Sequence, residues 1–204
     1  MDKKGSKMKQ LLWINACMRG PEQSRTDALC RIFLEEFKNA HSDWTVKERN
    51  LADKCLDVMD AAGAQRRDRA VEAGNMEAPE LEIARELAAV DAVVIGAPYW
   101  DLSFPAQLKV YLEWASTMGV TFHYTESGAC EGLCRADRLL YITTAGGPVW
   151  GQNFGFDYVK ALANMLGIHR AHCVAAENLD VWGGPGEENM RKAGEQLRKM
   201  AEAW

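Results

Sequence analysis

Residues 24–26 (Ser-Arg-Thr) have the composition of an anion-binding segment at the start of a helix. The first backbone N–H groups of a helix have no acceptor within it, and the helix dipole is positive there, so a phosphate is stabilised. The hydroxyls add donors, and Arg19 or Arg25 adds positive charge. The same residues also suit an ordinary capped helix, with Ser24 as the N-cap, so this segment alone leaves both interpretations open.

Two further segments could surround a flat ring. Residues 98–103 read Pro-Tyr-Trp-Asp-Leu-Ser after the apolar run 92–95, and Pro98 and Pro105 restrict the backbone around two large aromatic side chains. Residues 144–148 contain Gly146 and Gly147, which permit a ligand to approach the backbone closely. Alternatively, the aromatic residues fill the core and the glycines form a tight connection between a strand and a helix.

All three segments follow predicted strands, and the carboxyl edge of an open α/β sheet is where ligands bind. Together they predict a site for a monophosphate joined to a planar heterocycle, which fits FMN. The patterns GxGxxG and GxxxxGK[ST] are absent, which argues against a Rossmann dinucleotide site and a P-loop. The nucleophile pattern GxSxG is also absent.

The elements that position these segments alternate between strand and helix patterns. Short apolar or alternating runs predict five strands, at 9–15, 44–51, 90–95, 138–144 and 168–176. One-sided apolar spacing predicts helices that begin after Ser24, at Pro79, after Ser103 as the cap, at Tyr158 and at Glu187. Residues 120–125 suggest a short hairpin or an extended arm, and Gly167 is expected to end the helix before it. We expect a flavodoxin-like three-layer α/β fold with a parallel sheet in the order 2-1-3-4-5.

Composition narrows the functional class. The chain has 204 residues, a net charge of −5 and 48% hydrophobic residues, so we expect one domain (1–204) and no general binding of nucleic acid. Residues 1–8 are expected to form a disordered tail, and 52–78 to hold short helices or a flap. No apolar run approaches the roughly 20 residues that span a membrane, so a cytoplasmic protein is the default expectation. The six cysteines form no CxxC pair, which favours free thiols and no metal site.

Four motifs carry a resemblance to a known family: Q-S-R-T at 23–26, G-A-P-Y-W-D-L-S at 96–103 with Q-L-K at 107–109, G-V-T-F-H-Y-T at 119–125, and T-T-A-G-G at 143–147. From Leu11 to about Asn189, the chain resembles the FMN-dependent NADH-azoreductases and NAD(P)H:quinone oxidoreductases, which are flavodoxin-like proteins. The third motif discriminates best, because general flavodoxins are not expected to have it. The resemblance implies a homodimer with FMN in each of two sites near the interface.

By position, the resemblance implies thirteen cofactor-binding residues. Those expected around the phosphate are Cys17, Ser24, Arg25 and Thr26, and those expected around the ring are Pro98, Tyr99, Trp100, Asp101, Leu102, Thr144, Ala145, Gly146 and Gly147. The chain departs from the family at three of them. Cys17 stands where serine is frequent, Asp101 where asparagine is common, and Ala145 where some members have a polar or basic residue. A carboxylate at position 101 would disfavour negative charge on a reduced ring unless it is paired or turned away.

The implied activity is a ping-pong transfer of two electrons from NADH or NADPH, through FMN, to a small quinone or azo compound. The cofactor carries the redox chemistry, so no catalytic side chain is required. Aromatic candidates for the substrate pocket are Phe122, Tyr124, Trp150 and Trp182, although aromatic residues more commonly fill the core or an interface. The alternative from another class is a flavodoxin-like electron-transfer or flavin-binding module that does not itself oxidise NAD(P)H.

Overall fold

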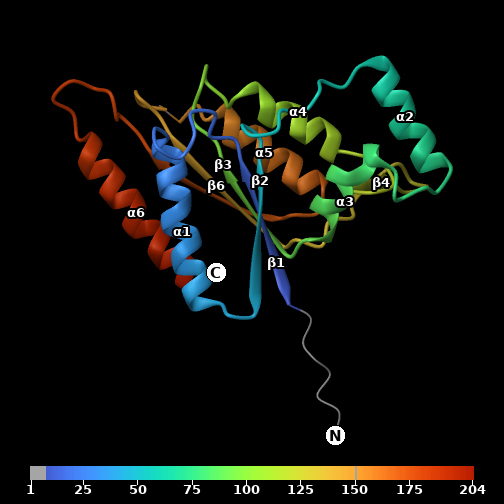
Figure 1. The fold of residues 1–204 in the computed structure, drawn as a ribbon, viewed down its shortest axis with the longest axis horizontal. Coiled ribbons are helices and arrows are strands. Elements are labelled where there is room, and N and C mark those ends of the chain that lie inside the picture. Colours follow the sequence, from blue (N-terminus) through green and yellow to red (C-terminus); the bar gives the residue numbers. More distant parts are fainter. Residues whose placement is uncertain (1–7, 150) are drawn as a thin grey trace, which may run out of the picture.

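A five-stranded parallel sheet forms the centre of the computed structural model, which describes residues 8–149 and 151–204. Its strands lie in the spatial order β2 (Trp44–Asn50), β1 (Lys9–Asn15), β3 (Ala92–Gly96), β6 (Arg138–Thr144) and β7 (Arg170–Ala176) (Figure 1). Every neighbouring pair is parallel. The predicted order is therefore confirmed, with β6 and β7 as the fourth and fifth predicted strands. The first and fourth also have the predicted bounds.

Helices cover both faces of the sheet. Side chains of successive strand residues point to opposite faces, so an unbroken apolar run supplies both cores. In β1, Leu11 and Trp13 pack with α1 (Arg25–Ala40) and α6 (Gly186–Glu202). Leu12 and Ile14 pack with α3 (Glu82–Ala89), α4 (Ala106–Ala115) and α5 (Phe154–Met165). Figure 1 shows α1 and α6 together on one side of the sheet and α3 to α5 on the other.

The predicted starts of two helices are wrong. Ser103 does not cap α4, which begins at Ala106 after Pro105. The backbone of Ser103 is instead used in a turn with Trp100, where the Ser103 N–H donates to the Trp100 carbonyl at 2.8 Å. The helix expected from Tyr158 begins earlier, at Phe154, because the Asn153 side chain accepts a hydrogen bond from the Phe156 N–H and caps it.

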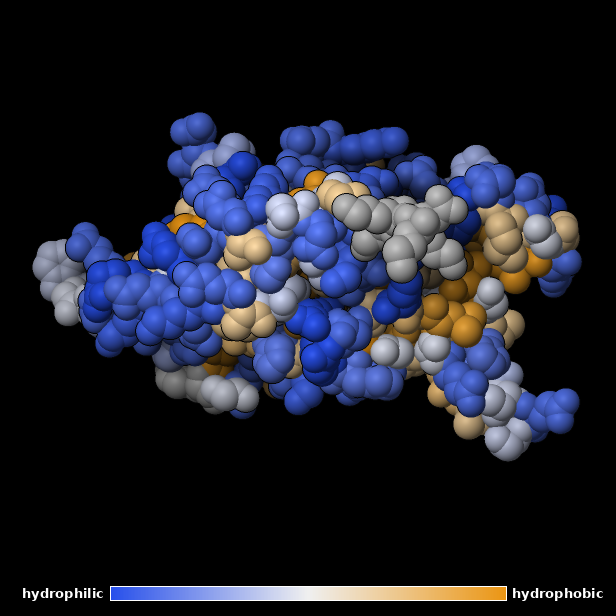
Figure 2. Space-filling model, turned by 90° about the horizontal axis from the view of Figure 1, so that it is seen from below, coloured by the Kyte–Doolittle hydropathy of each residue, from blue (hydrophilic) through white to orange (hydrophobic). Residues whose placement is uncertain are grey.

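Residues 52–78 contain α2 (Ala61–Glu72), which projects from the body of the molecule (Figure 1), and the short helix η1 (Pro79–Leu81) follows. The arm expected at 120–125 is a hairpin of β4 (Phe122–Tyr124) and β5 (Cys130–Gly132). Seen from below, apolar residues are visible between the projecting segments at this end of the molecule (Figure 2). Gly167 follows α5 with φ +92°, a conformation that favours glycine and agrees with its predicted role.

The described residues offer neither a membrane-spanning helix nor a cluster of metal ligands. In residues 8–149 and 151–204, no helix has both the length and the apolar character to cross a membrane. The same residues contain no group of three or more His, Cys, Asp or Glu side chains arranged to hold a metal ion. No disulfide joins the six cysteines.

Candidate functional site

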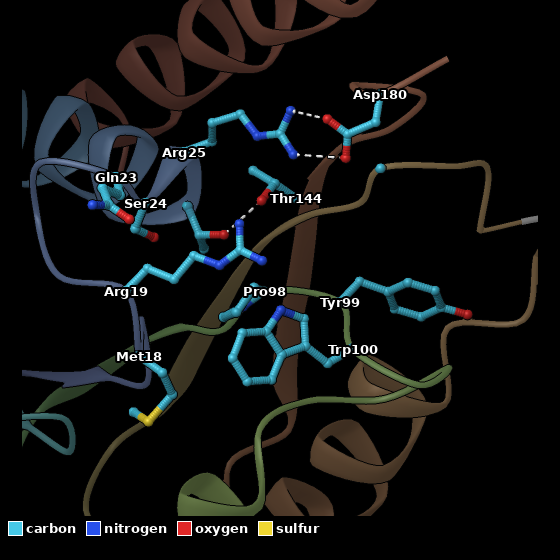
Figure 3. A pocket seen from close by; sticks show the side chains of 12 residues that line it. Met18, Arg19, Gln23, Ser24, Arg25, Pro98, Tyr99, Trp100, Thr144 and Asp180 are labelled. Atoms are coloured by element: carbon cyan, nitrogen blue, oxygen red, sulfur yellow. Dashed lines mark hydrogen bonds and ion pairs between the residues drawn. The ribbon is translucent and has the colours of Figure 1, made fainter. Parts of the chain in front are cut away.

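A cavity of about 220 Å³ lies at the carboxyl edge of the sheet, where the three predicted segments meet. Its walls are formed by the loops after β1, β3 and β6, and the loop after β7 contributes one residue. Its lining residues are Met18, Arg19, Gln23, Ser24, Arg25, Thr26, Pro98, Tyr99, Trp100, Thr144, Gly146 and Asp180 (Figure 3). Eight of the thirteen predicted cofactor residues are among them.

The start of α1 forms the polar end of the cavity. Ser24 is its N-cap, and the Ser24 hydroxyl accepts a hydrogen bond from the Asp27 N–H at 3.2 Å. The hydroxyls of Thr26 and Thr144 lie 2.7 Å apart and join α1 to the end of β6. The backbone amides of Arg25 and Thr26 remain available to a ligand, since they have no acceptors within the helix. This end therefore offers several hydrogen-bond donors to an anion.

A buried polar network below α1 holds this loop in place. Asn15, at the end of β1, donates from its amide to Asp27 at 3.0 Å and to Glu48 at 2.9 Å. Its side-chain oxygen accepts a hydrogen bond from the Cys17 N–H at 3.0 Å. Asn15 and Asp27 are both almost fully buried. Because unpaired polar groups are costly to bury, these bonds fix the path of the chain from β1 into the loop.

Arg25 lines the cavity, but its guanidinium is engaged at the cavity's edge. Its guanidinium donates two hydrogen bonds to Asp180, at 2.7 and 3.0 Å, and turns toward the loop after β7 (Figure 3). The hydrogen bonds from Arg25 lower the pKa of the Asp180 carboxyl below its ordinary value, and the positive charge of Arg19 acts in the same direction. The Asp180 carboxyl is therefore anionic at neutral pH and beside the cavity.

The loop that carries Asp180 lies along the loop that carries the glycines. Three consecutive N–H groups of the loop after β7, from Asn178 to Asp180, donate to the carbonyls of Gly147, Ala145 and Gly146, at 3.1, 3.2 and 2.9 Å. A Cβ at Gly146 would stand 2.4 Å from the Asp180 carboxylate, so a glycine is required for this approach. In the part of the chain that is described, no acceptor pairs with the N–H of Gly146 or Gly147.

The loop after β3 forms the aromatic wall. The Tyr99 N–H donates to the Thr144 carbonyl at 2.9 Å, which joins this loop to the end of β6. The Tyr99 phenol donates to the Gln152 carbonyl at 2.9 Å and points away from the arginines (Figure 3). Asp101 and Leu102 form the tip of a turn, with φ of 50° and 67°. Such values are uncommon for a bulky residue like leucine and mark a backbone that its surroundings hold in place.

Five predicted cofactor residues are not part of the cavity lining. Cys17 and Ala145 are buried beneath it, and the Cys17 thiol lies 3.7 Å from the Gly96 carbonyl oxygen. Asp101 and Leu102 are exposed at the tip of their turn, and Gly147 lies just beyond Gly146. Of the substrate-pocket candidates, Phe122 and Tyr124 lie on the hairpin and Trp182 is 98% exposed on the loop after β7. Trp150 lies outside the described residues.

Sequence reasoning missed three lining residues: Met18, Gln23 and Asp180. Met18 and Gln23 belong to the predicted first loop, so the loop was expected but not these side chains. Asp180 follows the fifth predicted strand, whose carboxyl end reaches the same edge of the sheet. Examining the segment after every strand, including the last one, would have included it.

The fold is also found in known proteins, and the match extends from β1 into α6. A family model described as flavodoxin-like fold matches residues 9–201. The chain belongs to this family. Among flavodoxin-like relatives, the chain is 30% identical to FMN-dependent NADH:quinone oxidoreductase 2 of Clostridium acetobutylicum, over 95% of this chain and 98% of that protein. It is 29% identical to the FMN-dependent NADH:quinone oxidoreductase of Coprothermobacter proteolyticus, with the same coverage.

Solved structures of flavodoxin-like proteins share the fold. An azoreductase from Bacillus anthracis matches with a TM-score of 0.86 at 24% identity, over 97% of this chain and 100% of that one. An FMN-dependent NADH-azoreductase from the same species, solved in complex with FMN, matches with a TM-score of 0.83 at 24% identity, over 96% and 99% of the two chains. The likeness to these two structures concerns the fold.

Proposed function

We propose that this protein is an FMN-dependent oxidoreductase that transfers two electrons from NADH or NADPH to quinones or azo compounds. The observation that carries the proposal is the cavity itself, which has an anion-binding helix start at one end and an aromatic wall at the other. The names of the curated relatives support the same reading, since they are NADH:quinone oxidoreductases that depend on FMN.

The residues that line the cavity fit FMN at both ends. The hydroxyls of Ser24 and Thr26, with the amides at the start of α1, would hold the phosphate. Pro98 and Trp100 would lie beside the ring, since they form the apolar wall. The N–H groups of Gly146 and Gly147, which have no partner among the described residues, would face its polar edge. No titratable side chain is needed for proton transfer in this arrangement.

The protein's own residues bind and orient the reactants. When bound, FMN would supply the redox chemistry of a two-electron transfer between a reduced nicotinamide and a flat acceptor. The backbone hydrogen bonds of the Ala145–Gly147 segment fix the amide donors of the glycine loop, so these donors would face the polar edge of a bound ring without reorganising. The exposed indole of Trp100 leaves room for a second flat molecule to stack at this wall.

An absorbance spectrum tests the proposal most directly. Purified protein mixed with FMN and freed of excess ligand should retain flavin bands, and anaerobic NADH or NADPH should bleach them. Addition of a benzoquinone should restore the bands. Absence of retained flavin would refute the proposal. Retained flavin that neither nicotinamide bleaches would favour the electron-carrier alternative.

Gly146→Trp tests where the cofactor binds. A Cβ at this position would meet the Asp180 carboxylate at 2.4 Å, so the Asp180 side chain must move, and an indole beside it would compete with a ligand for the cavity that Gly146 lines. We expect the variant to lose FMN binding. Asn39→Trp, at an exposed position near the far end of α1, is the matched control and should bind FMN like the unmodified protein. Equal FMN affinity in both variants would contradict this placement.

The same proposal includes a homodimer. Large exposed apolar side chains occur on the projecting segments and beside the cavity: Val58, Trp100, Leu102, Met118, Tyr124, Leu133, Phe154 and Tyr158. Figure 2 shows apolar residues gathered at the end of the molecule where α2 and the hairpin project. Exposed patches of this kind are typical of contacts between chains. Analytical ultracentrifugation should give twice the mass of the chain, and Tyr124→Ser should weaken the association.

A further inference from the structure

The cavity contains three charged side chains, and they are not equivalent. Arg25 is held by two hydrogen bonds to Asp180, so its donors at that edge are occupied. Arg19 lines the same cavity and extends into it (Figure 3). Across residues 8–149 and 151–204, no carboxylate forms an ion pair with Arg19. Of the charged residues that line the cavity, Arg25 is therefore paired with the carboxylate of Asp180, and Arg19 is open to a ligand.

The position of Asp180 is set by the backbone. Its N–H donates to the Gly146 carbonyl at 2.9 Å, and the preceding residue, Leu179, donates to Ala145 at 3.2 Å. The Leu179 carbonyl also accepts a hydrogen bond from Arg25 at 3.4 Å. The Asp180 carboxylate consequently stays against Gly146 and in the cavity lining, although its side chain is 64% exposed. A ligand phosphate that binds at the start of α1 shares the cavity with this negative charge.

We infer that Asp180 is a specificity-determining residue that opposes the cofactor phosphate, and that Arg19 is the cation that recognises that phosphate. The inference rests on the proposed function. A phosphate monoester carries between one and two negative charges at neutral pH, so a carboxylate in the same cavity repels it. Asp180 also occupies the guanidinium of Arg25, which is the nearest alternative cation along the chain. Arg19 then remains as the uncommitted charge in the cavity.

The ratio of the affinities for FMN and riboflavin isolates this effect, because the two molecules share a ring and differ in the phosphate. Quenching of flavin fluorescence on titration with protein gives both dissociation constants. Asp180→Asn removes the repulsion and frees Arg25, so the preference for FMN over riboflavin should rise about fivefold. Arg19→Gln removes the free cation, so the preference should fall about tenfold.

Two further variants control for loop movement and for net charge. In the double variant Arg25→Gln with Asp180→Asn, both members of the pair are neutral, and the preference should stay within about twofold of the unmodified protein. Asp137→Asn makes the same charge change on an exposed carboxylate before β6, at the opposite edge of the sheet, where Asp137 pairs with Arg138 and Arg170. That variant should leave the preference unchanged, since screening limits the reach of a surface charge.

Several results would overturn the inference. If Asp180→Asn weakens FMN and riboflavin equally, the pair only fastens the loop. If Arg19→Gln leaves the preference unchanged, Arg19 does not read the phosphate. If Asp137→Asn shifts the preference as much as Asp180→Asn, the effect is one of net charge. The failure of the proposed function looks different, because the unmodified protein would then bind neither flavin.

Discussion

Replacing Gly96 with alanine should destabilise the protein through a single clash. Gly96 is the last residue of β3 and pairs with Asn15 of β1 and Ile142 of β6. A Cβ there would lie 2.5 Å from the Cys30 sulfur, which belongs to a fully buried side chain on α1. Overpacking of this kind costs about 1–3 kcal/mol. Restricting the unfolded chain returns about 0.4–1 kcal/mol, so we expect a net loss of about 1–2 kcal/mol.

A double-mutant cycle with Cys30→Ala tests the cause. That substitution removes the sulfur that the new methyl group meets, at a cost of about 1 kcal/mol for the lost apolar contact. If the clash is the cause, the double variant should lose about 1 kcal/mol less free energy of unfolding than the two single variants lose in sum. Urea unfolding followed by tryptophan fluorescence, at one protein concentration, gives the four free energies of unfolding.

The cycle also has a readout at the site. The Gly96 carbonyl accepts a hydrogen bond from the Ala16 N–H at 2.8 Å, so a shift at Gly96 moves the start of the phosphate loop. FMN affinity should fall in Gly96→Ala and recover in the double variant. Additive free energies, within about 0.3–0.5 kcal/mol, would refute the packing argument. An unchanged FMN affinity in Gly96→Ala would refute its link to the loop.

Three other predictions concern buried polar groups. Asn15→Asp removes the donor that serves the buried Asp27 and adds a like charge, so unfolding at pH 7 should require about 2–4 kcal/mol less, with a smaller difference at pH 5. Burial raises the pKa of the Cys134 and Cys173 thiols to about 12, so iodoacetamide at pH 8 should modify the exposed Cys55 and Cys130 first, as peptide mass spectrometry would show. Between about pH 9 and 12 the thiols of Cys134 and Cys173 lose their protons in the unfolded chain but keep them in the folded chain. The free energy of unfolding should therefore fall as pH rises through this range, and it should fall less steeply in Cys134→Ala.

The sheet was predictable because its central strands are buried on both faces. A short unbroken apolar run such as Leu11–Ile14 is typical of a parallel strand that is covered on both faces. The bounds of β1 and β6 follow from such runs. The start of α4 was not predictable from local chemistry. Ser103 is a good cap in isolation, but its backbone is used to close a turn whose two central residues have positive φ. The surroundings of that turn, and not its own residue types, select this conformation.

The convergence of the three loops was predictable from topology, whereas the charges within the cavity were not. The residue types left open whether Arg19 or Arg25 would face the ligand, and the family resemblance implied Arg25. The answer depends on Asp180, which is 155 residues away from Arg25 and lies in a loop without a recognisable pattern. A pairing over that distance leaves no local signal. The same limit applies to Cys17, whose side chain is buried because Gly96 and Cys30 surround it.

The pair between Arg25 and Asp180 has a consequence for the biosynthesis of the protein. Chains leave the ribosome from the N-terminus at roughly 5–20 residues per second, so Asp180 emerges roughly 8–30 seconds after Arg25. β1, β2 and β3 can pair during that interval, because they are neighbours in the sheet and come first in the chain. The cavity, however, lacks its last wall until β7 and the loop beyond it have been made. Part of the sheet can therefore form well before the ligand site is complete, whereas α6, which covers one face of the sheet, is made only after Asp180.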